Sequence, residues 1–123
     1  MKTHALIFAL CVVCAACRGG VPAPTPRVAT GGSPSRGEHA LTAYGCGACH
    51  TIPGVRGARG QVGPPLTAFA ERSFIAGRIP NAPDNLIRWI LYPQSVDPQT
   101  AMPMLNVRPN DARDMAAYLY TLK

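Results

Sequence analysis

Proline recurs so often in this chain that regular secondary structure is restricted to short pieces. The 123 residues include 13 prolines and 12 glycines, and both residue types interrupt helices and strands. From residue 37 onward, helical patterns span 38–46, 67–74, 83–92 and a last segment from Asn110. No stretch alternates as a strand does. The sequence therefore predicts an all-α domain of four short helices.

The last of these helices has the clearest pattern. Asn110 follows Pro109 and is a favourable N-cap. Apolar residues then repeat on one helical face, at Met115, Tyr118, Leu119 and Leu122. We expect this face to be buried.

The apolar content available to a folded core is small. The chain is 47% hydrophobic, but a dense apolar run occupies the first 16 positions. A chain of this length has room for one small domain, and such domains bury little surface. Something other than apolar side chains must supplement the core.

Residues 1–16 are typical of an export signal. Lys2 precedes an uninterrupted apolar stretch, 5–16, that ends in small residues. That stretch is shorter than the ~20 residues needed to cross a bilayer as a helix. Cleavage after Ala16 would expose Cys17, and the Cys14-Ala-Ala-Cys17 run resembles the bacterial lipoprotein signal. Cys17 is thus a candidate lipidation site, while ordinary signal cleavage at the same bond would leave an unmodified, soluble protein.

Residues 17–36 are predicted to be a tether. The segment is rich in proline, glycine and arginine and has no large apolar side chain, a composition that stays extended and solvated. Residues 37–123 form the predicted domain and hold eight Lys and Arg against six Asp and Glu. No basic stripe with interleaved aromatic residues is present, so the sequence does not support nucleic-acid binding.

The distinctive chemistry lies in Cys46-Gly-Ala-Cys49-His50, the pattern of c-type haem attachment. On a helical turn, cysteines three residues apart project from one face and can each form a thioether with a haem vinyl group. The adjacent His50 can then bind the iron. A large apolar ring would also supply the core that the chain lacks.

Other uses of these residues are less well supported. A structural zinc site needs four ligands, and the domain has no second cysteine pair and no histidine besides His39 and His50. A thioredoxin-like dithiol would require a βαβ context. A plain disulfide between Cys46 and Cys49 stays possible in an exported protein, but it gives His50 no role.

Residues 37–123 resemble a class I c-type cytochrome. The resemblance rests on CGACH at 46–50, GPPL at 63–66, a helix around Trp89, TAMP at 100–103 and the C-terminal DARDMAAYLY helix. It implies a small cytochrome c fold in which the first and last helices cross around one covalent haem c.

The resemblance also implies a set of site residues. It gives His50 and Met102 as the two axial ligands, because Met102 stands in the position before Pro103 that the family uses, while Met104 is left to packing. It gives the backbone carbonyl of Pro64 as the partner of the His50 imidazole. Arg78 and Trp89 are candidate donors to the haem propionates.

The function expected from these residues is one-electron transfer in an extracytoplasmic respiratory chain, without a small-molecule substrate and without catalysis. The expected partners are a quinol-oxidising complex, a dehydrogenase or a terminal oxidase, with the membrane reached through lipid on Cys17 in the periplasm or on the outer face. An alternative is a haem enzyme or sensor with an open sixth iron position, although His39 is the only spare acid–base group. A haem with only a structural role is a third possibility.

Overall fold

The computed structural model describes residues 29–123, so the expected leader and most of the expected tether lie outside it. The main helices are α1 (Pro34–Ala43), α2 (Pro83–Leu91), α3 (Pro93–Val96) and α4 (Pro109–Leu119). Two 3₁₀ turns, η1 (Cys46–Ala48) and η2 (Phe69–Glu71), and the short strands β1 (Phe74–Ile75) and β2 (Ile79–Pro80) complete the fold. All four α-helices begin with proline in the first turn, where its missing N–H is not needed.

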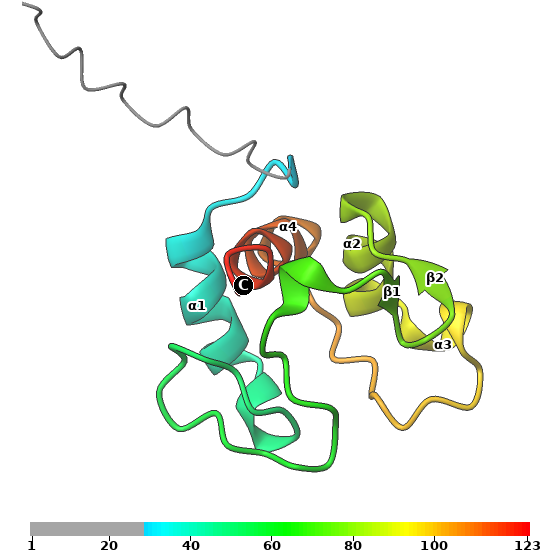
Figure 1. Cartoon of the computed structure of the whole chain (residues 1–123), viewed down its shortest axis with the longest axis horizontal. Helices are drawn as coiled ribbons and strands as arrows, with labels where there is room; N and C mark the ends of the chain where they lie inside the picture. The colour runs from blue at the N-terminus through cyan, green and yellow to red at the C-terminus, as the bar shows by residue number, and fades with distance from the viewer. Residues whose placement is uncertain (1–28) are drawn as a thin grey trace, which may run out of the picture.

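Helix α4 is the centre of the fold. It packs against α1 on one side and α2 on the other, as Figure 1 shows. The crossing of α1 and α4 is close at Gly37, where an added Cβ would lie 2.9 Å from the Cβ of Tyr118 and would overlap the backbone of Asp114. Glycine therefore lets the two backbones touch. The small, mostly helical fold expected from the sequence is confirmed.

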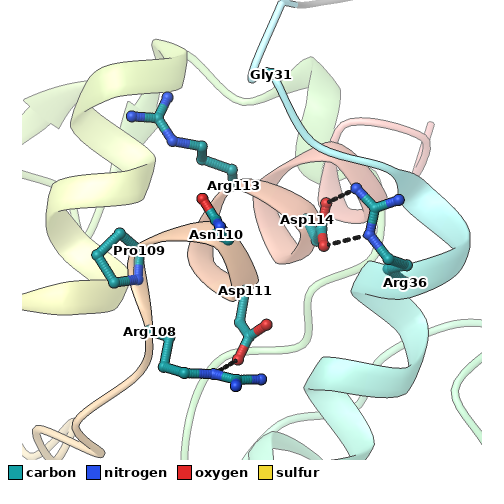
Figure 2. Close-up of a pocket in the computed structure, with 8 residues that line it drawn as sticks. All are labelled: Gly31, Arg36, Arg108, Pro109, Asn110, Asp111, Arg113 and Asp114. Carbon is teal, nitrogen blue, oxygen red and sulfur yellow. Dashed lines mark hydrogen bonds and ion pairs between the residues drawn. The ribbon is translucent and has the colours of Figure 1, made fainter.

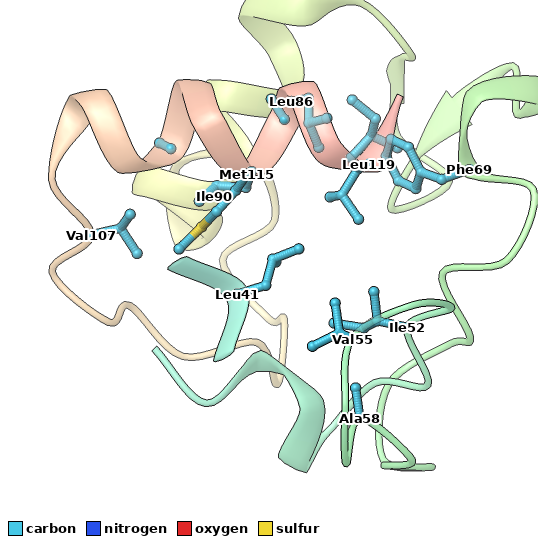
Figure 3. Close-up of a cluster of buried hydrophobic side chains, with 13 residues drawn as sticks. Leu41, Ile52, Val55, Ala58, Phe69, Leu86, Ile90, Val107, Met115 and Leu119 are labelled. Atoms are coloured by element: carbon cyan, nitrogen blue, oxygen red, sulfur yellow. The ribbon is translucent and has the colours of Figure 1, made fainter. Parts of the chain in front are cut away.

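The hydrophobic core lies between these helices and the loop that follows η1 (Figure 3). Leu41 from α1, Leu86 and Ile90 from α2, and Met115 from α4 are buried around its middle. Leu86 and Met115 are each only 1% exposed to solvent. Within residues 29–123, no helix combines the length and the apolar character that a membrane span requires.

Several boundaries differ from the sequence prediction. Helix α1 begins at Pro34, three residues before the expected domain boundary, and ends at Ala43 rather than at 46. The N-cap of α4 is Arg108 and not Asn110, because Pro109 occupies the first turn. The short helix α3 was not predicted.

The predicted helix over 67–74 is wrong. Only the 3₁₀ turn η2 forms there, because Ala68 has a φ of +48° and the side-chain amide of Asn81 donates hydrogen bonds of 3.0 Å to the carbonyls of Phe69 and Arg72. The chain then forms the antiparallel β1–β2 hairpin, in which Phe74 faces Pro80 and Ile75 faces Ile79. These two strands were also not predicted.

Candidate functional site

A tight turn after α1 brings the two cysteines and the histidine of the CGACH motif together. Gly45, with a φ of +71°, ends α1 and starts η1. The carbonyl of Cys46 accepts hydrogen bonds from the N–H of Cys49 at 3.3 Å and of His50 at 3.0 Å. This single turn therefore presents three side chains with sulfur or nitrogen donors within five residues.

The loop after this motif folds back and locks the turn. The N–H of Gly60 donates to the carbonyl of Gly47 at 3.0 Å, and the N–H of Gly63 donates to the carbonyl of Cys49 at 2.8 Å. An added Cβ on Gly63 would lie 2.7 Å from Nδ1 of His50. The absence of a side chain at Gly63 thus lets the loop lie directly against the imidazole, a restriction that the GPPL resemblance alone did not reveal.

His50 is oriented by its neighbour across the loop. Its Nδ1 lies 2.7 Å from the carbonyl oxygen of Pro64. A carbonyl can only accept, so Nδ1 must carry the hydrogen and donate it. The other nitrogen, Nε2, is then left with a lone pair and can bind a metal ion.

An apolar cavity lies between the motif, α2, α4 and the loop before α4. Its lining combines Cys46 and His50 with Trp89 and Met102, and the remaining walls are Leu41, Leu66, Phe69, Leu86, Ile90, Leu105, Val107, Met115 and Leu119. Burial raises the pKa of the Cys46 thiol, because the charged thiolate is poorly solvated there.

This donor set fits a covalently attached haem. His50 and Met102 line one apolar cavity, and an imidazole and a thioether are both side-chain groups that can bind a haem iron. The thiol of Cys46 borders the same cavity, while Cys49 is half-buried on the same turn without lining it. Both cysteines are free thiols, so neither is committed to a disulfide.

The two candidate methionines are placed differently. Met102 lines the cavity and is half-buried, whereas Met104 does not line it and is 54% exposed. Within residues 29–123, Met115 is the only other methionine on the lining, and it is buried in the core on α4.

The two candidate propionate donors are also separated. Trp89 lines the cavity, and its indole N–H has no hydrogen-bond partner among the described residues. Arg78 does not line it, and its exposed guanidinium forms an ion pair of 3.2 Å with Asp97. The structure therefore brings Cys46, His50, Trp89 and Met102 together and leaves Arg78 outside.

A second and more polar pocket lies at the start of α4, between it and α1 (Figure 2). Arg36 and Arg108 line it, but their guanidinium groups already pair with Asp114 and Asp111, each at 2.8 Å. These ion pairs raise the pKa of both arginines. The pocket shares no lining residue with the apolar cavity.

Arg36 belongs to this cluster and not to a solvated tether. Its Nε and Nη2 donate to the two carboxylate oxygens of Asp114 at 2.8 and 2.9 Å, and the N–H of Ser33 donates to the same carboxylate at 2.6 Å. The expectation that residues through 36 stay outside the folded part is therefore corrected.

Comparison with known proteins agrees with the haem-attachment motif of this site. The family model described as cytochrome c matches residues 34–123. The chain is also similar to the cytochrome c oxidase subunit 2 of Alkalihalophilus pseudofirmus, with 34% identity over 90 residues. That match covers 72% of this chain and 25% of the relative, so it spans about a quarter of the longer protein.

Proposed function

Since this chain belongs to the cytochrome c family, with its covalently bound haem c, we propose that it is a one-electron carrier whose iron is ligated by His50 and Met102. The haem supplies an iron that accepts one electron from a donor protein and passes it to an acceptor. One observation carries the proposal: an imidazole and a thioether face the same apolar cavity beside the cysteine motif.

The roles of the chain's residues follow from their positions. Cys46 and Cys49 hold the haem by thioether bonds, and His50 binds through Nε2 because Nδ1 donates to Pro64. That hydrogen bond fixes the plane of the imidazole and increases its basicity. Met102 would supply the second protein ligand to the iron, and a histidine–methionine pair favours a raised reduction potential.

Trp89 and Arg78 are proposed as partners of the haem propionates. The free indole N–H of Trp89 on the cavity lining supports its part of the proposal. Arg78 would have to turn from Asp97 toward the haem, and its exposure leaves it free to do so.

The cavity lining supports a carrier over an enzyme or sensor. Apart from Cys46 and His50, every residue that lines it is apolar or aromatic, without an acid–base group. His39 is exposed on α1 and does not line the cavity. Chemistry on a bound peroxide would need a positioned general acid, which this lining does not offer.

The electron partners are proposed to be respiratory. The similarity to a cytochrome c oxidase subunit 2 supports a terminal oxidase as acceptor, with a quinol-oxidising complex or dehydrogenase as donor. Residues 1–16 would direct export, and the residues between Cys17 and the folded domain would tether it to the outer face of a bacterial membrane through lipid on Cys17. A tether raises the effective concentration near membrane partners.

The proposal is tested by redox titration of the purified protein together with carbon monoxide binding. A carrier with two protein ligands should titrate as a single one-electron centre and should not bind carbon monoxide readily when reduced. Rapid binding by the wild-type protein would instead support the enzyme or sensor alternative.

A further inference from the structure

We propose that Gln94 is a positioning residue that holds Met102 in its ligand orientation. The inference rests on the proposed His50 and Met102 ligation and extends it to a residue outside the cavity. Gln94 donates a hydrogen bond of 2.8 Å from its side-chain Nε2 to the backbone carbonyl of Met102.

The segment that carries Met102 has little support of its own. Within the described part of the chain, residues 101–107 form no backbone–backbone hydrogen bond. Pro103 removes one donor and restricts Met102 to extended conformations. Asn106 has a φ of +52°, a conformation that non-glycine residues rarely adopt. Side chains must therefore hold this segment in place.

Both backbone polar groups of Met102 form hydrogen bonds with side chains. Its N–H donates to Oγ1 of Thr100 at 3.2 Å, and its carbonyl accepts the bond from Gln94. Thr100 lies in the same loop and moves with it, whereas Gln94 belongs to a different element. Gln94 alone of this pair connects the methionine to the rest of the fold.

The helix that carries Gln94 is held in the fold at its first residue. Gln94 lies on α3, which begins at Pro93, a residue with less than 2% of its surface exposed. The N–H of Asp97 donates to the carbonyl of Pro93 at 2.9 Å, and this bond closes α3. Helix α3 follows directly after α2, which carries Trp89 and Ile90 of the cavity wall. The hydrogen bond from Gln94 therefore fixes the Met102 backbone relative to the cavity wall formed by α2.

The chain offers a matched control in Gln99. Gln99 lies five residues farther along the same exposed segment, and its side chain makes no hydrogen bond within residues 29–123. Substitutions of Gln94 and Gln99 to Leu and to Glu form two matched pairs. The Leu variants remove the donor without adding charge, and the Glu variants test the added charge.

The experiment measures two properties of the haem-loaded variants: the intensity of the sulfur-to-iron charge-transfer band of the oxidised protein, and the rate of carbon monoxide binding to the reduced protein. Loss of one hydrogen bond should raise the methionine-dissociated population about fivefold. We expect Gln94→Leu and Gln94→Glu to show a weaker band and to bind carbon monoxide faster, while both Gln99 variants match the wild type. These readouts report the iron ligand, which a merely structural change in α3 would leave unaltered.

A Met102→Ala variant distinguishes failure of the ligand assignment from failure of the role proposed for Gln94. If the band survives in Met102→Ala, the ligand assignment itself is wrong. If Met102→Ala loses the band while Gln94→Leu behaves as the wild type, only the role of Gln94 is overturned. Equal effects of the Gln94 and Gln99 variants would also overturn it, since charge or solvation would then be the cause.

Discussion

Arg36 and Asp114 form a two-point ion pair that joins the first turn of α1 to the middle of α4, although 78 residues separate them in sequence. The Asp114 side chain is 7% exposed. The hydrogen bonds from Arg36 lower the pKa of Asp114 below its ordinary value, and the N–H of Ser33 acts in the same direction against the effect of burial. The stability of the α1–α4 crossing should therefore depend on the protonation of Asp114.

We predict that this ion pair stabilises the fold above about pH 4 and that the stabilisation is lost in acid. A carboxyl with a lowered folded pKa adds stability above its ordinary pKa near 3.9, and this contribution disappears as the pH falls through the folded value. Asp114→Asn should lower the denaturant midpoint at neutral pH and approach the wild type as the pH falls. Denaturant unfolding at several pH values measures this.

Asp84→Asn is the matched control for that experiment. Asp84 is exposed in the first turn of α2 and forms no ion pair among the described residues, so its variant should follow the wild-type pH profile closely. A wild-type-like profile for Asp114→Asn would show that the ion pair does not stabilise the crossing.

A second prediction concerns Gly63 and the imidazole that it faces. Gly63→Ala places a methyl group against the His50 ring and should cost about 1–3 kcal/mol of stability through overpacking. The displaced ring would donate a weaker hydrogen bond to Pro64 and become less basic, so the reduction potential should rise. Potentiometric titration and thermal unfolding check both effects.

Val62→Ala provides the comparison in the same loop, because Val62 is 79% exposed. It should change neither the potential nor the stability beyond about 0.5 kcal/mol. An unchanged potential in Gly63→Ala would mean that the ring keeps its orientation.

Local signals predicted some elements well. The segment 83–92 has proline and aspartate at its start and an apolar face, and it forms α2 over Pro83–Leu91. The CGACH motif forms one turn through local hydrogen bonds from the N–H groups of Cys49 and His50 to the carbonyl of Cys46. Such features are encoded within about ten residues.

Elements that depend on distant partners could not be predicted. The start of α1 at Pro34 depends on the Arg36–Asp114 pair, and the absence of a helix at 67–74 depends on the side chain of Asn81. The β1–β2 hairpin turns through Ala76 at a φ of +52° and Gly77 at +65°, and the glycine is the one residue of the two that signals a turn. The contact of Gln94 with Met102 spans only eight residues, but it depends on how the irregular loop between them folds and was not visible in the sequence.

A third prediction concerns the membrane tether, which lies outside the described residues. Cys17→Ser should move the exported protein from the membrane to the soluble fraction, because stable anchoring needs the acyl chains on that residue. Cys11→Ser changes a cysteine of the expected leader outside the Cys14–Cys17 run and should leave the protein on the membrane. Fractionation with immunodetection measures this, and a wild-type protein that is already soluble would show that Cys17 carries no lipid.

A fourth prediction concerns the covalent attachment. The wild-type mass should equal the mature chain plus one haem, and acidified organic solvent should not extract it. The double variant Cys46→Ser/Cys49→Ser should release its haem and lose most of its stable fold, because the haem completes a small core. Ala48→Ser keeps both thiols at an exposed position of the same turn and should retain the haem. Extraction of haem from the wild type would contradict thioether attachment.

The final prediction separates the two methionines of the loop. Met102→Ala should abolish the sulfur-to-iron charge-transfer band, lower the reduction potential and open the reduced iron to carbon monoxide, because axial-ligand identity strongly affects haem potential. Met104→Ala should retain the band, since Met104 is 54% exposed and does not line the cavity. Its cost in stability should stay near 0.5 kcal/mol, as for other surface substitutions. Spectra, potentiometry and carbon monoxide binding of the two variants are compared directly, and the reverse pattern would assign Met104 as the ligand.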